Sequence, residues 1–173
     1  DRLGAHLVFL DESGFLLVPT IVKTWSPKGK TPVIATAGHW TKISAISAIS
    51  ASPKRKRLGL HIRFHTDKNI KTQETIGFLC HLLKHLRGEI ILLWDGSPVH
   101  RAAPVKRLLA VHPRLEAYRF PGYAPELNPD EFIWAKLKRT LANSVPNGTD
   151  HLRQLLVAPV RRIKNSQRLL WSC

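Results

Sequence analysis

Apolar and polar residues alternate along several short stretches in the first half of the chain. In "HLVFLDESGFLLV" (residues 6–18) an apolar run leads to an acid, and Ser13-Gly14 predicts a turn before a second apolar run. The stretches "WTKISAISAIS" (40–50) and "LHIRFH" (60–65) alternate as half-buried strands do. The basic stretch "SPKRKRLG" (52–59) between them predicts a turn. The first half therefore predicts strands.

The second half changes between helical spacing and short strands. Helical spacing occurs in "TQETIGFLCHLLKHL" (72–86), "AAPVKRLLAVH" (102–112) and "NPDEFIWAKLKRTLA" (128–142). The continuous apolar run "EIILLWDG" (89–96) is typical of a buried central strand, and "LEAYRFP" (115–121) predicts another strand. Strands followed by alternating helices and strands indicate an α/β fold, a mixed sheet covered by helices.

The composition of 173 residues with 43% hydrophobic content predicts one domain with a real core, residues 1–173. No apolar run approaches the roughly 20 residues of a membrane span, so no membrane contact is expected. Cys80 and Cys173 form no CxxC pair, which argues against a zinc ribbon or disulfide scaffold and suits a reducing compartment. The chain starts at Asp1 and contains no Met, so we expect it to be part of a longer protein.

The charge is strongly positive, with 27 Lys and Arg against 12 Asp and Glu and a net charge of +15. The simplest use of this excess is to neutralise nucleic-acid phosphates. A ribosome-like or merely soluble basic surface is the alternative. Residues 150–173 predict a basic C-terminal helical tail, in which Pro159 is expected to kink or end the helix.

Three acids stand at positions that favour chemistry. Asp11 and Asp95 each follow an apolar strand, and Glu131 lies in the first turn of a helix. Open sheets place chemistry at strand ends, and clustered carboxylates repel one another unless cations lie between them. Oxygen ligands with few His or Cys nearby select Mg²⁺ or Mn²⁺. Two such ions about 4 Å apart activate a nucleophile and stabilise a leaving oxygen on phosphate.

Each of these acids also has a structural interpretation. Asp95-Gly96 is a common turn dipeptide. Glu131 follows Asn128 by three residues, which is the spacing of a capping box. Asp11 could end a strand that turns into solvent.

The acids next to this set are expected to point elsewhere. Side chains alternate along a strand, so Glu12 should face away from Asp11. On a helix, Asp130 is rotated by about 100° from Glu131, and we expect it to cap the helix.

The segments "LDES", "LLWDGSPVHR" and "YAPELNPDEFIWAKLKR" resemble the DDE triad of the Tc/mariner superfamily, especially bacterial insertion-sequence transposases of the IS-six-thirty type. The interval from Asp95 to Glu131 is close to that superfamily's usual interval. The resemblance implies an RNase H-like (retroviral-integrase-like) fold with five strands. Asp11 would lie on the first strand, Asp95 at the end of the fourth, and Glu131 on a late helix.

The same resemblance implies a DNA transposase catalytic domain. Asp11, Asp95 and Glu131 would hold two Mg²⁺ or Mn²⁺ ions. Water would attack a phosphodiester at a transposon end, and the freed 3′ hydroxyl would attack target DNA. The expected partners are DNA and a second copy of the protein. The expected location is the cytoplasm of a bacterium, in association with the nucleoid. The family's N-terminal helix-turn-helix modules are expected to be absent here, and Gly96-Ser97 stands where the family often has Asn.

The predicted DNA contacts are basic or aromatic residues close to the acids or on loops. They are Lys136, Lys138, Arg139, His100, Lys54, Arg55, Lys56, Arg57 and Trp25. His100 occupies the family's DxxxxH position, where it would contact DNA or orient Asp95; a satisfied loop histidine is the alternative. Trp134 is expected in the core.

Two other functions stay open from the sequence. A ribonuclease or resolvase on the same fold usually has a fourth acid near the site, for which Glu12, Asp67 and Glu74 are candidates. A catalytically inactive DNA-binding remnant is the other. Amide substitutions of the three acids separate these functions, because a nuclease would lose cleavage and keep DNA binding.

Overall fold

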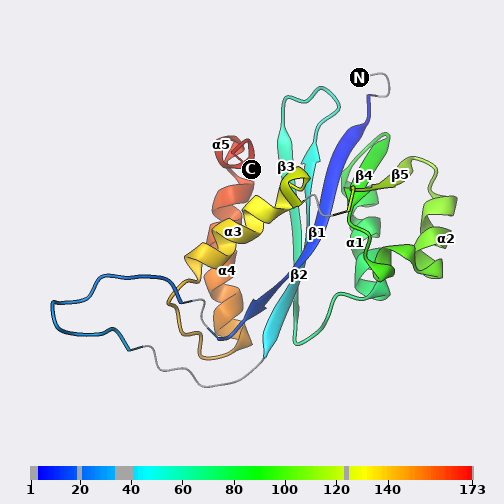
Figure 1. The fold of residues 1–173 in the computed structure, drawn as a ribbon. Coiled ribbons are helices and arrows are strands. Elements are labelled where there is room, and N and C mark those ends of the chain that lie inside the picture. The colour runs from blue at the N-terminus through cyan, green and yellow to red at the C-terminus, as the bar shows by residue number, and fades with distance from the viewer. Residues whose placement is uncertain (1–3, 19–20, 34–40, 123–124, 173) are drawn as a thin grey trace.

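The computed structural model describes residues 4–18, 21–33, 41–122 and 125–172, and its centre is one five-stranded mixed sheet (Figure 1). The strands are β1 (His6–Leu16), β2 (Lys42–Ala51), β3 (Leu58–Thr66), β4 (Ile90–Trp94) and β5 (Leu115–Arg119). Their order in the sheet is β3-β2-β1-β4-β5. β1 is antiparallel to β2 and parallel to β4, and β5 is parallel to β4.

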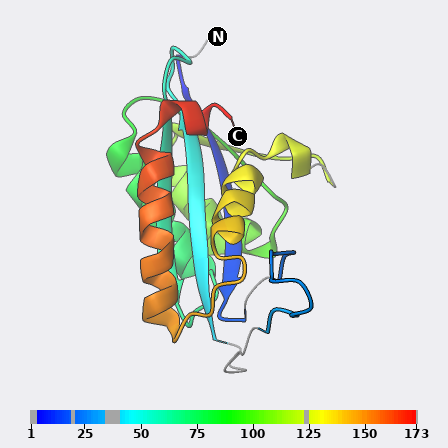
Figure 2. The same cartoon turned by 90° about the vertical axis from the view of Figure 1, so that its left-hand side faces the viewer.

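Helices cover both faces of this sheet. They are α1 (Thr72–His85), η1 (Pro98–Arg101), α2 (Ala103–Val111), η2 (Pro125–Leu127), α3 (Asp130–Thr140), α4 (Thr149–Lys164) and α5 (Gln167–Leu170). α1 and α2 lie on one face, whereas α3, α4 and α5 lie on the other (Figures 1 and 2). Within the described residues, no helix combines the length and the apolar character needed to cross a membrane.

The sheet separates two apolar cores, and β2 contributes to both because its side chains alternate. Ile43 and Ile49 pack with α3 and α4, whereas Ile46 packs with α1. The short residues of "KISAISAISA" allow this central strand to be buried on both faces. The alternating pattern that predicted the strand therefore also explains the two-sided core.

Predictions of a turn and of helix ends from neighbouring residues differ from the structure at three places. Ser13 does not begin a turn, because β1 continues to Leu16 and Ser13 pairs with Ala45 of β2. Pro159 does not end the last long helix, because α4 continues past it to Lys164, and a kink at Pro159 stays a prediction. Helix α3 begins at Asp130, two residues later than the pattern from Asn128 suggested. Pairing and burial outweighed the local preferences.

The segment predicted as a basic tail is a structural layer of the domain. Leu152 and Leu156 of α4 are completely buried against the sheet, and Leu170 of α5 joins the same core. The Lys and Arg residues of the segment are exposed on α4 and α5. The residues of the predicted motifs at 123–124, and Cys173, lie outside the described residues.

Candidate active site

The parallel pairing of β1 and β4 brings two of the predicted acids to the same level. His6 pairs with Ile90 and Phe9 with Leu93. Two residues further along each chain, this register sets Asp11 level with Asp95, with neighbouring strands about 4.8 Å apart. β4 ends at Trp94 whereas β1 continues to Leu16, so both acids lie at the carboxyl end of β4.

Asp11 faces α3 and is held by the indole of Trp134. Trp134 Nε1 donates a hydrogen bond of 2.9 Å to Asp11 Oδ2. Burial raises the pKa of Asp11 from 3.8 to about 6; the indole hydrogen bond opposes this rise, and the charges of Glu12 and Glu131 add to it. Trp134 is in the core as predicted, and its N–H contributes a polar contact that the sequence did not reveal.

Glu131 is exposed at the second position of α3. It lies close enough to Asp11 for its charge to raise the pKa of that carboxyl group. The structure thus brings Glu131 near Asp11, and Asp11 level with Asp95.

Asp130 is buried completely and does not cap the helix, which contradicts the prediction. Its Oδ1 accepts a hydrogen bond from Ser47 of β2, and Oδ2 has no partner among the described residues. The backbone N–H of Asp130 instead donates to Asn128 Oδ1 at 3.2 Å. Complete burial raises the pKa of Asp130 well above its ordinary value. Asp130 therefore joins α3 to β2 inside the protein.

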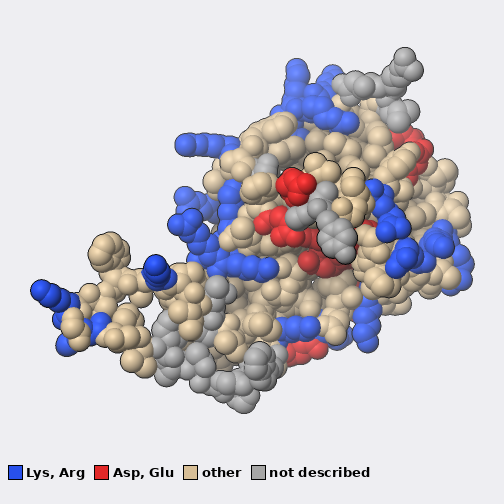
Figure 3. Space-filling view, viewed as in Figure 1, with Lys and Arg blue, Asp and Glu red and all other residues tan. Residues whose placement is uncertain are grey.

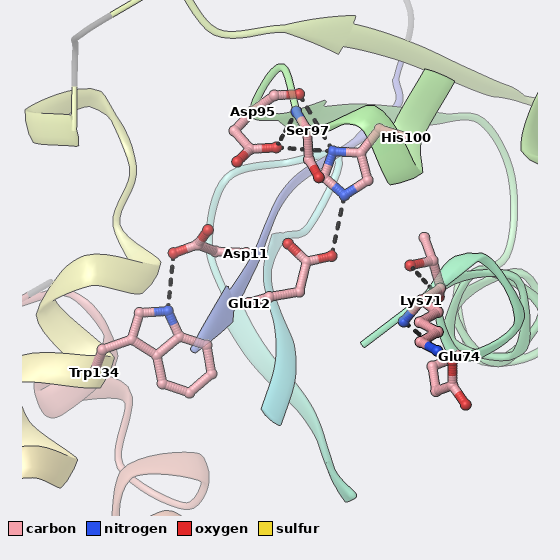
Figure 4. A network of polar contacts seen from close by, with 9 residues as sticks. Asp11, Glu12, Lys71, Glu74, Asp95, Ser97, His100 and Trp134 are labelled. Atoms are coloured by element: carbon pink, nitrogen blue, oxygen red, sulfur yellow. Dashed lines mark hydrogen bonds and ion pairs between the residues drawn. The ribbon is translucent and has the colours of Figure 1, made fainter. Parts of the chain in front are cut away.

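Glu12 points away from Asp11, as alternation predicted, and meets a histidine. His100 Nε2 lies 3.0 Å from Glu12 Oε1, and His100 Nδ1 lies 2.9 Å from Asp95 Oδ1 (Figure 4). Asp95 Oδ1 also accepts a hydrogen bond of 2.8 Å from the backbone of Ser97. One imidazole thus bridges a carboxylate of β1 and the carboxylate that follows β4.

The environment of His100 favours its charged form. Burial lowers the pKa of its imidazole, but the hydrogen bond and charge of Glu12, together with Asp95, outweigh burial and raise it. A carboxylate only accepts hydrogen bonds, so an imidazole between two carboxylates satisfies both when both nitrogens carry hydrogen. The ring stacks on Trp94, with centroids 4.2 Å apart and planes 3° from parallel.

Asp11, Glu12 and Asp95 line one cavity of about 430 Å³, together with Ser97 and Asn69. In the space-filling view, acidic side chains gather near the middle of this face and Lys and Arg surround them (Figure 3). Acidic side chains in such a pocket can bind a metal cation, and the Lys and Arg side chains around it can bind a phosphate group.

The residues of this site fit a divalent cation. Asp11 is a largely buried carboxylate whose ionisation is opposed by two neighbouring acids, and a cation would remove that repulsion. In the described part of the chain, metal-binding atoms of Glu12, Asp95 and His100 also lie within 4.8 Å of one another. Oxygen-rich ligand sets of this type suit Mg²⁺ or Mn²⁺.

The predicted DNA contacts on α3 divide into two groups. Lys138 and Arg139 are exposed, and Lys138 lies seven residues after Glu131, on the same side of the helix. Lys136 donates to Leu169 O at 3.2 Å and Ser172 Oγ at 2.8 Å, so it joins α3 to the C-terminal segment.

His100 is only 2% exposed, so of the two roles expected for it the geometry favours orientation of Asp95 over a DNA contact. This burial leaves little of the imidazole for a DNA contact.

The other predicted DNA contacts lie away from the acids. Lys54, Lys56 and Arg57 are exposed in the turn between β2 and β3, beside the start of β1 and far along the strand from Asp11. Arg55 in that turn has φ +54° and donates to Ala5 O at 2.9 Å. Trp25 is 99% exposed in the segment 21–33. Contacts of these residues with DNA stay predictions.

Sequence reasoning missed Arg119, at the end of β5. Its guanidinium lies against Gly96, where an added Cβ would collide with it. The guanidinium of Arg119 therefore lies beside the residue that follows Asp95. The sequence contained one signal for this contact, the glycine directly after Asp95.

The chain was compared with known families and proteins. The family described as DDE superfamily endonuclease matches residues 6–153. A search of curated proteins found no match to the sequence.

Solved structures show the same fold at low sequence identity. The pre-cleavage Mos1 transpososome has a TM-score of 0.72 at 17% identity, and the match covers 95% of this chain and 50% of that one. The Mos1 mariner paired end complex with Mn has a TM-score of 0.71 at 18% identity, covering 96% and 50%. The catalytic domain of Mos1 mariner transposase has a TM-score of 0.62 at 13% identity, covering 96% and 74%. The predicted RNase H-like fold is confirmed, and the chain spans half the length of the first two proteins.

Proposed function

The chain belongs to the DDE superfamily of endonucleases, and we propose that it is the catalytic domain of a DNA transposase. The observation that carries this proposal is that Asp11 and Asp95 line one cavity and that the charge of Glu131 raises the pKa of Asp11. These acids stand in a chain of net charge +15, which suits a phosphodiester substrate. The likeness to a Mos1 transpososome and to a Mos1 paired end complex supports the same proposal.

In this proposal Asp11, Asp95 and Glu131 hold two Mg²⁺ or Mn²⁺ ions. The likeness to a Mos1 complex with Mn supports a divalent metal. Ions bound there would activate a water for attack on the phosphodiester and neutralise charge that develops on the phosphate.

The protein's own residues orient these carboxylates and the substrate. Trp134 Nε1 fixes one oxygen of Asp11, and the backbone of Ser97 fixes one oxygen of Asp95. In this proposal the exposed cations Lys138, on the helix of Glu131, and Arg119, beside Gly96, bind phosphates of the DNA. Holding the substrate and the carboxylates in fixed geometry is the main contribution a protein makes to phosphoryl transfer.

The proposed reaction has two stages at this one site. Water first cleaves a phosphodiester at the transposon end and leaves a 3′ hydroxyl. That hydroxyl then attacks a phosphodiester of target DNA, so that a new P–O bond joins it to the target 5′ phosphate while the target's own bond to phosphorus breaks and releases a 3′ hydroxyl. Two copies of the protein are proposed in the working complex, and the bacterial insertion-sequence branch stays a prediction.

The first experiment is a crystal grown with Mn²⁺ and measured for anomalous scattering. We expect density within about 2.0–2.4 Å of oxygens of Asp11, Asp95 and Glu131. In solution, Asp11→Asn, Asp95→Asn and Glu131→Gln should lose Mn²⁺-dependent nicking of supercoiled plasmid and keep DNA binding. Glu89→Gln is the matched control, because Glu89 is an exposed acid just before β4, at its opposite end.

Two results would contradict the proposal. Mn²⁺ bound away from these three acids would remove the proposed chemistry. DNA binding without nicking by the unchanged chain, together with no Mn²⁺ site, would favour the inactive DNA-binding remnant.

A second candidate is another nuclease of the same fold, and one observation favours it. Glu12 lines the same cavity as Asp11 and Asp95, where a ribonuclease of this fold would have a fourth acid. Joining assays separate the two functions. A transposase domain joins a labelled oligonucleotide with a free 3′ hydroxyl to a plasmid, whereas a ribonuclease cleaves an RNA–DNA hybrid and joins nothing.

A further inference from the structure

We propose that His100 is a positioning residue that anchors Asp95 to Glu12, and that Glu12 holds His100 in place without binding the metal. This inference rests on the proposed function, because it concerns the same metal site. It gives the acid next to Asp11 a separate role on the other face of β1.

His100 is fixed on all sides by the fold. Its side chain is 2% exposed, and its ring stacks on Trp94, the last residue of β4. The short helix η1 brings it back toward the strand end that it follows, where its Nδ1 also lies 3.3 Å from Asp95 O. A buried ring with both nitrogens engaged has little freedom to rotate.

Asp95 needs such an anchor because it lies beyond the end of its strand. Its side chain is 55% exposed, so packing does little to restrict it. The imidazole Nδ1 at 2.9 Å and the Ser97 N–H at 2.8 Å both engage the same oxygen, Oδ1. Figure 4 shows the other carboxylate oxygen pointing away from the imidazole, on the side where Asp11 lies. Oδ2 is therefore the Asp95 oxygen placed for a cation shared with Asp11.

Glu12 reaches the imidazole from the opposite side. Glu12 Oε1 lies 3.0 Å from Nε2, and the side chain is 22% exposed, so it is more enclosed than Asp95. Because side chains alternate along β1, Asp11 points toward α3 and Glu12 toward η1. One strand thus supplies a metal ligand and, with the next residue, the support for a second ligand. Partners of this kind orient ligands in many metal sites.

The competing arrangement is a metal bound by Glu12, Asp95 and His100 themselves, whose atoms lie within 4.8 Å of one another. The direct contacts disfavour it. Each imidazole nitrogen already faces a carboxylate oxygen at hydrogen-bond distance, and the two carboxylates lie on opposite sides of the ring. A metal ion would have to replace one of these contacts.

Three substitutions of His100 separate positioning from packing. In His100→Asn the amide nitrogen lies near the position of Nδ1, so the contact to Asp95 can be kept. In His100→Gln the amide nitrogen lies near the position of Nε2, so the contact to Glu12 is kept and that to Asp95 is lost. His100→Phe retains a ring that stacks on Trp94 and loses both contacts. Mn²⁺ affinity is measured by electron paramagnetic resonance, and folding by urea titration.

We expect His100→Gln and His100→Phe to weaken Mn²⁺ binding on the order of 10- to 100-fold, the usual effect of removing a partner of a metal ligand. His100→Asn should bind Mn²⁺ more tightly than either variant. Equal affinity in the Phe variant and the unchanged chain would overturn the proposal, because packing alone would then suffice.

Glu12 variants test the other half of the proposal. Glu12→Gln keeps an oxygen that accepts from Nε2, so Mn²⁺ affinity should stay close to that of the unchanged chain. Glu12→Ala should weaken it, and Glu89→Gln should have no effect. Strong loss in Glu12→Gln, or anomalous Mn²⁺ density bonded to Glu12 or His100, would overturn the proposal in favour of the competing site.

These outcomes also separate this inference from the proposed function. If Asp95→Asn loses Mn²⁺ binding while His100→Gln and His100→Phe keep it, only the positioning role is contradicted. Absence of Mn²⁺ binding by the unchanged chain contradicts the proposed function, and the positioning role with it.

Discussion

Asp11→Asn is expected to stabilise the metal-free protein while it abolishes metal binding. Asp11 is mostly buried, and its pKa is raised from 3.8 to about 6 because burial opposes its charge. The amide carries no charge to bury, and its oxygen can still accept the 2.9 Å hydrogen bond from Trp134 Nε1. The substitution therefore removes a cost of folding and keeps the main contact.

The magnitude follows from the pKa. A rise from 3.8 to about 6 corresponds to about 3 kcal/mol, since one pKa unit is worth about 1.36 kcal/mol at 25 °C. The folded protein binds the proton more tightly than the unfolded chain, so stability falls as pH rises from about 4 to about 6 and stays lower above that. The variant should thus be more stable by up to about 3 kcal/mol at pH 8 and by about half of that at pH 5.

Urea unfolding with a chelator, at pH 8 and pH 5, measures this difference. Glu89→Gln serves as control, because Glu89 is exposed and its loss should leave stability almost unchanged. Added Mn²⁺ should stabilise the unchanged chain much more than Asp11→Asn, because the variant lacks one of the three carboxylates proposed to hold the ion. An Asn variant no more stable than the unchanged chain at pH 8, or a gain that is equal at both pH values, would refute the reasoning.

Three further results are expected. Trp134→Phe should raise the pKa of Asp11 above about 6, because the hydrogen bond to its charged form is lost, and carboxyl NMR titration would detect the change; an unchanged value would contradict the role of the indole. Ser47→Ala should lower the free energy of unfolding by about 1–3 kcal/mol, because Asp130 is buried and loses its one hydrogen-bond donor to Oδ1; a neutral effect in urea unfolding would count against this contact. Lys138→Gln should reduce the slope of log DNA affinity against log salt by about 0.9 without changing stability; an unchanged slope would exclude a phosphate contact.

Local sequence patterns predicted the elements that carry the site. The alternation of β2 and the apolar runs of β1 and β4 depend on neighbours within a few residues, so they could be read directly. The positions of Asp11 on a strand, Asp95 at a strand end and Glu131 in the first turn of a helix followed from the same patterns. Residue spacing also sufficed to predict that Glu12 and Asp11 diverge.

Local patterns were wrong where a distant partner decided the outcome. Ser13-Gly14 has turn character, yet pairing with β2 satisfies its backbone and keeps it in a strand. Asp130 has the sequence position of a helix-capping acid, yet it is buried in the interior, where the hydroxyl of Ser47 donates a hydrogen bond to it. Neither partner can be found from the residues next to these positions.

The sequence by itself determined the basic charge, the order of strands and helices, and the places of Asp95 after a strand and of Glu131 in the first turn of a helix. Asp11 was expected at a strand end, but it lies in the middle of β1 because pairing with β2 extends that strand to Leu16. Only the tertiary structure decided what meets at the site. Glu12 and His100 are 88 residues apart in sequence and come within 3.0 Å because β1 lies beside β4 in the sheet. Composition and periodicity act over a few residues, whereas such contacts depend on which strands become neighbours and on the faces they bury.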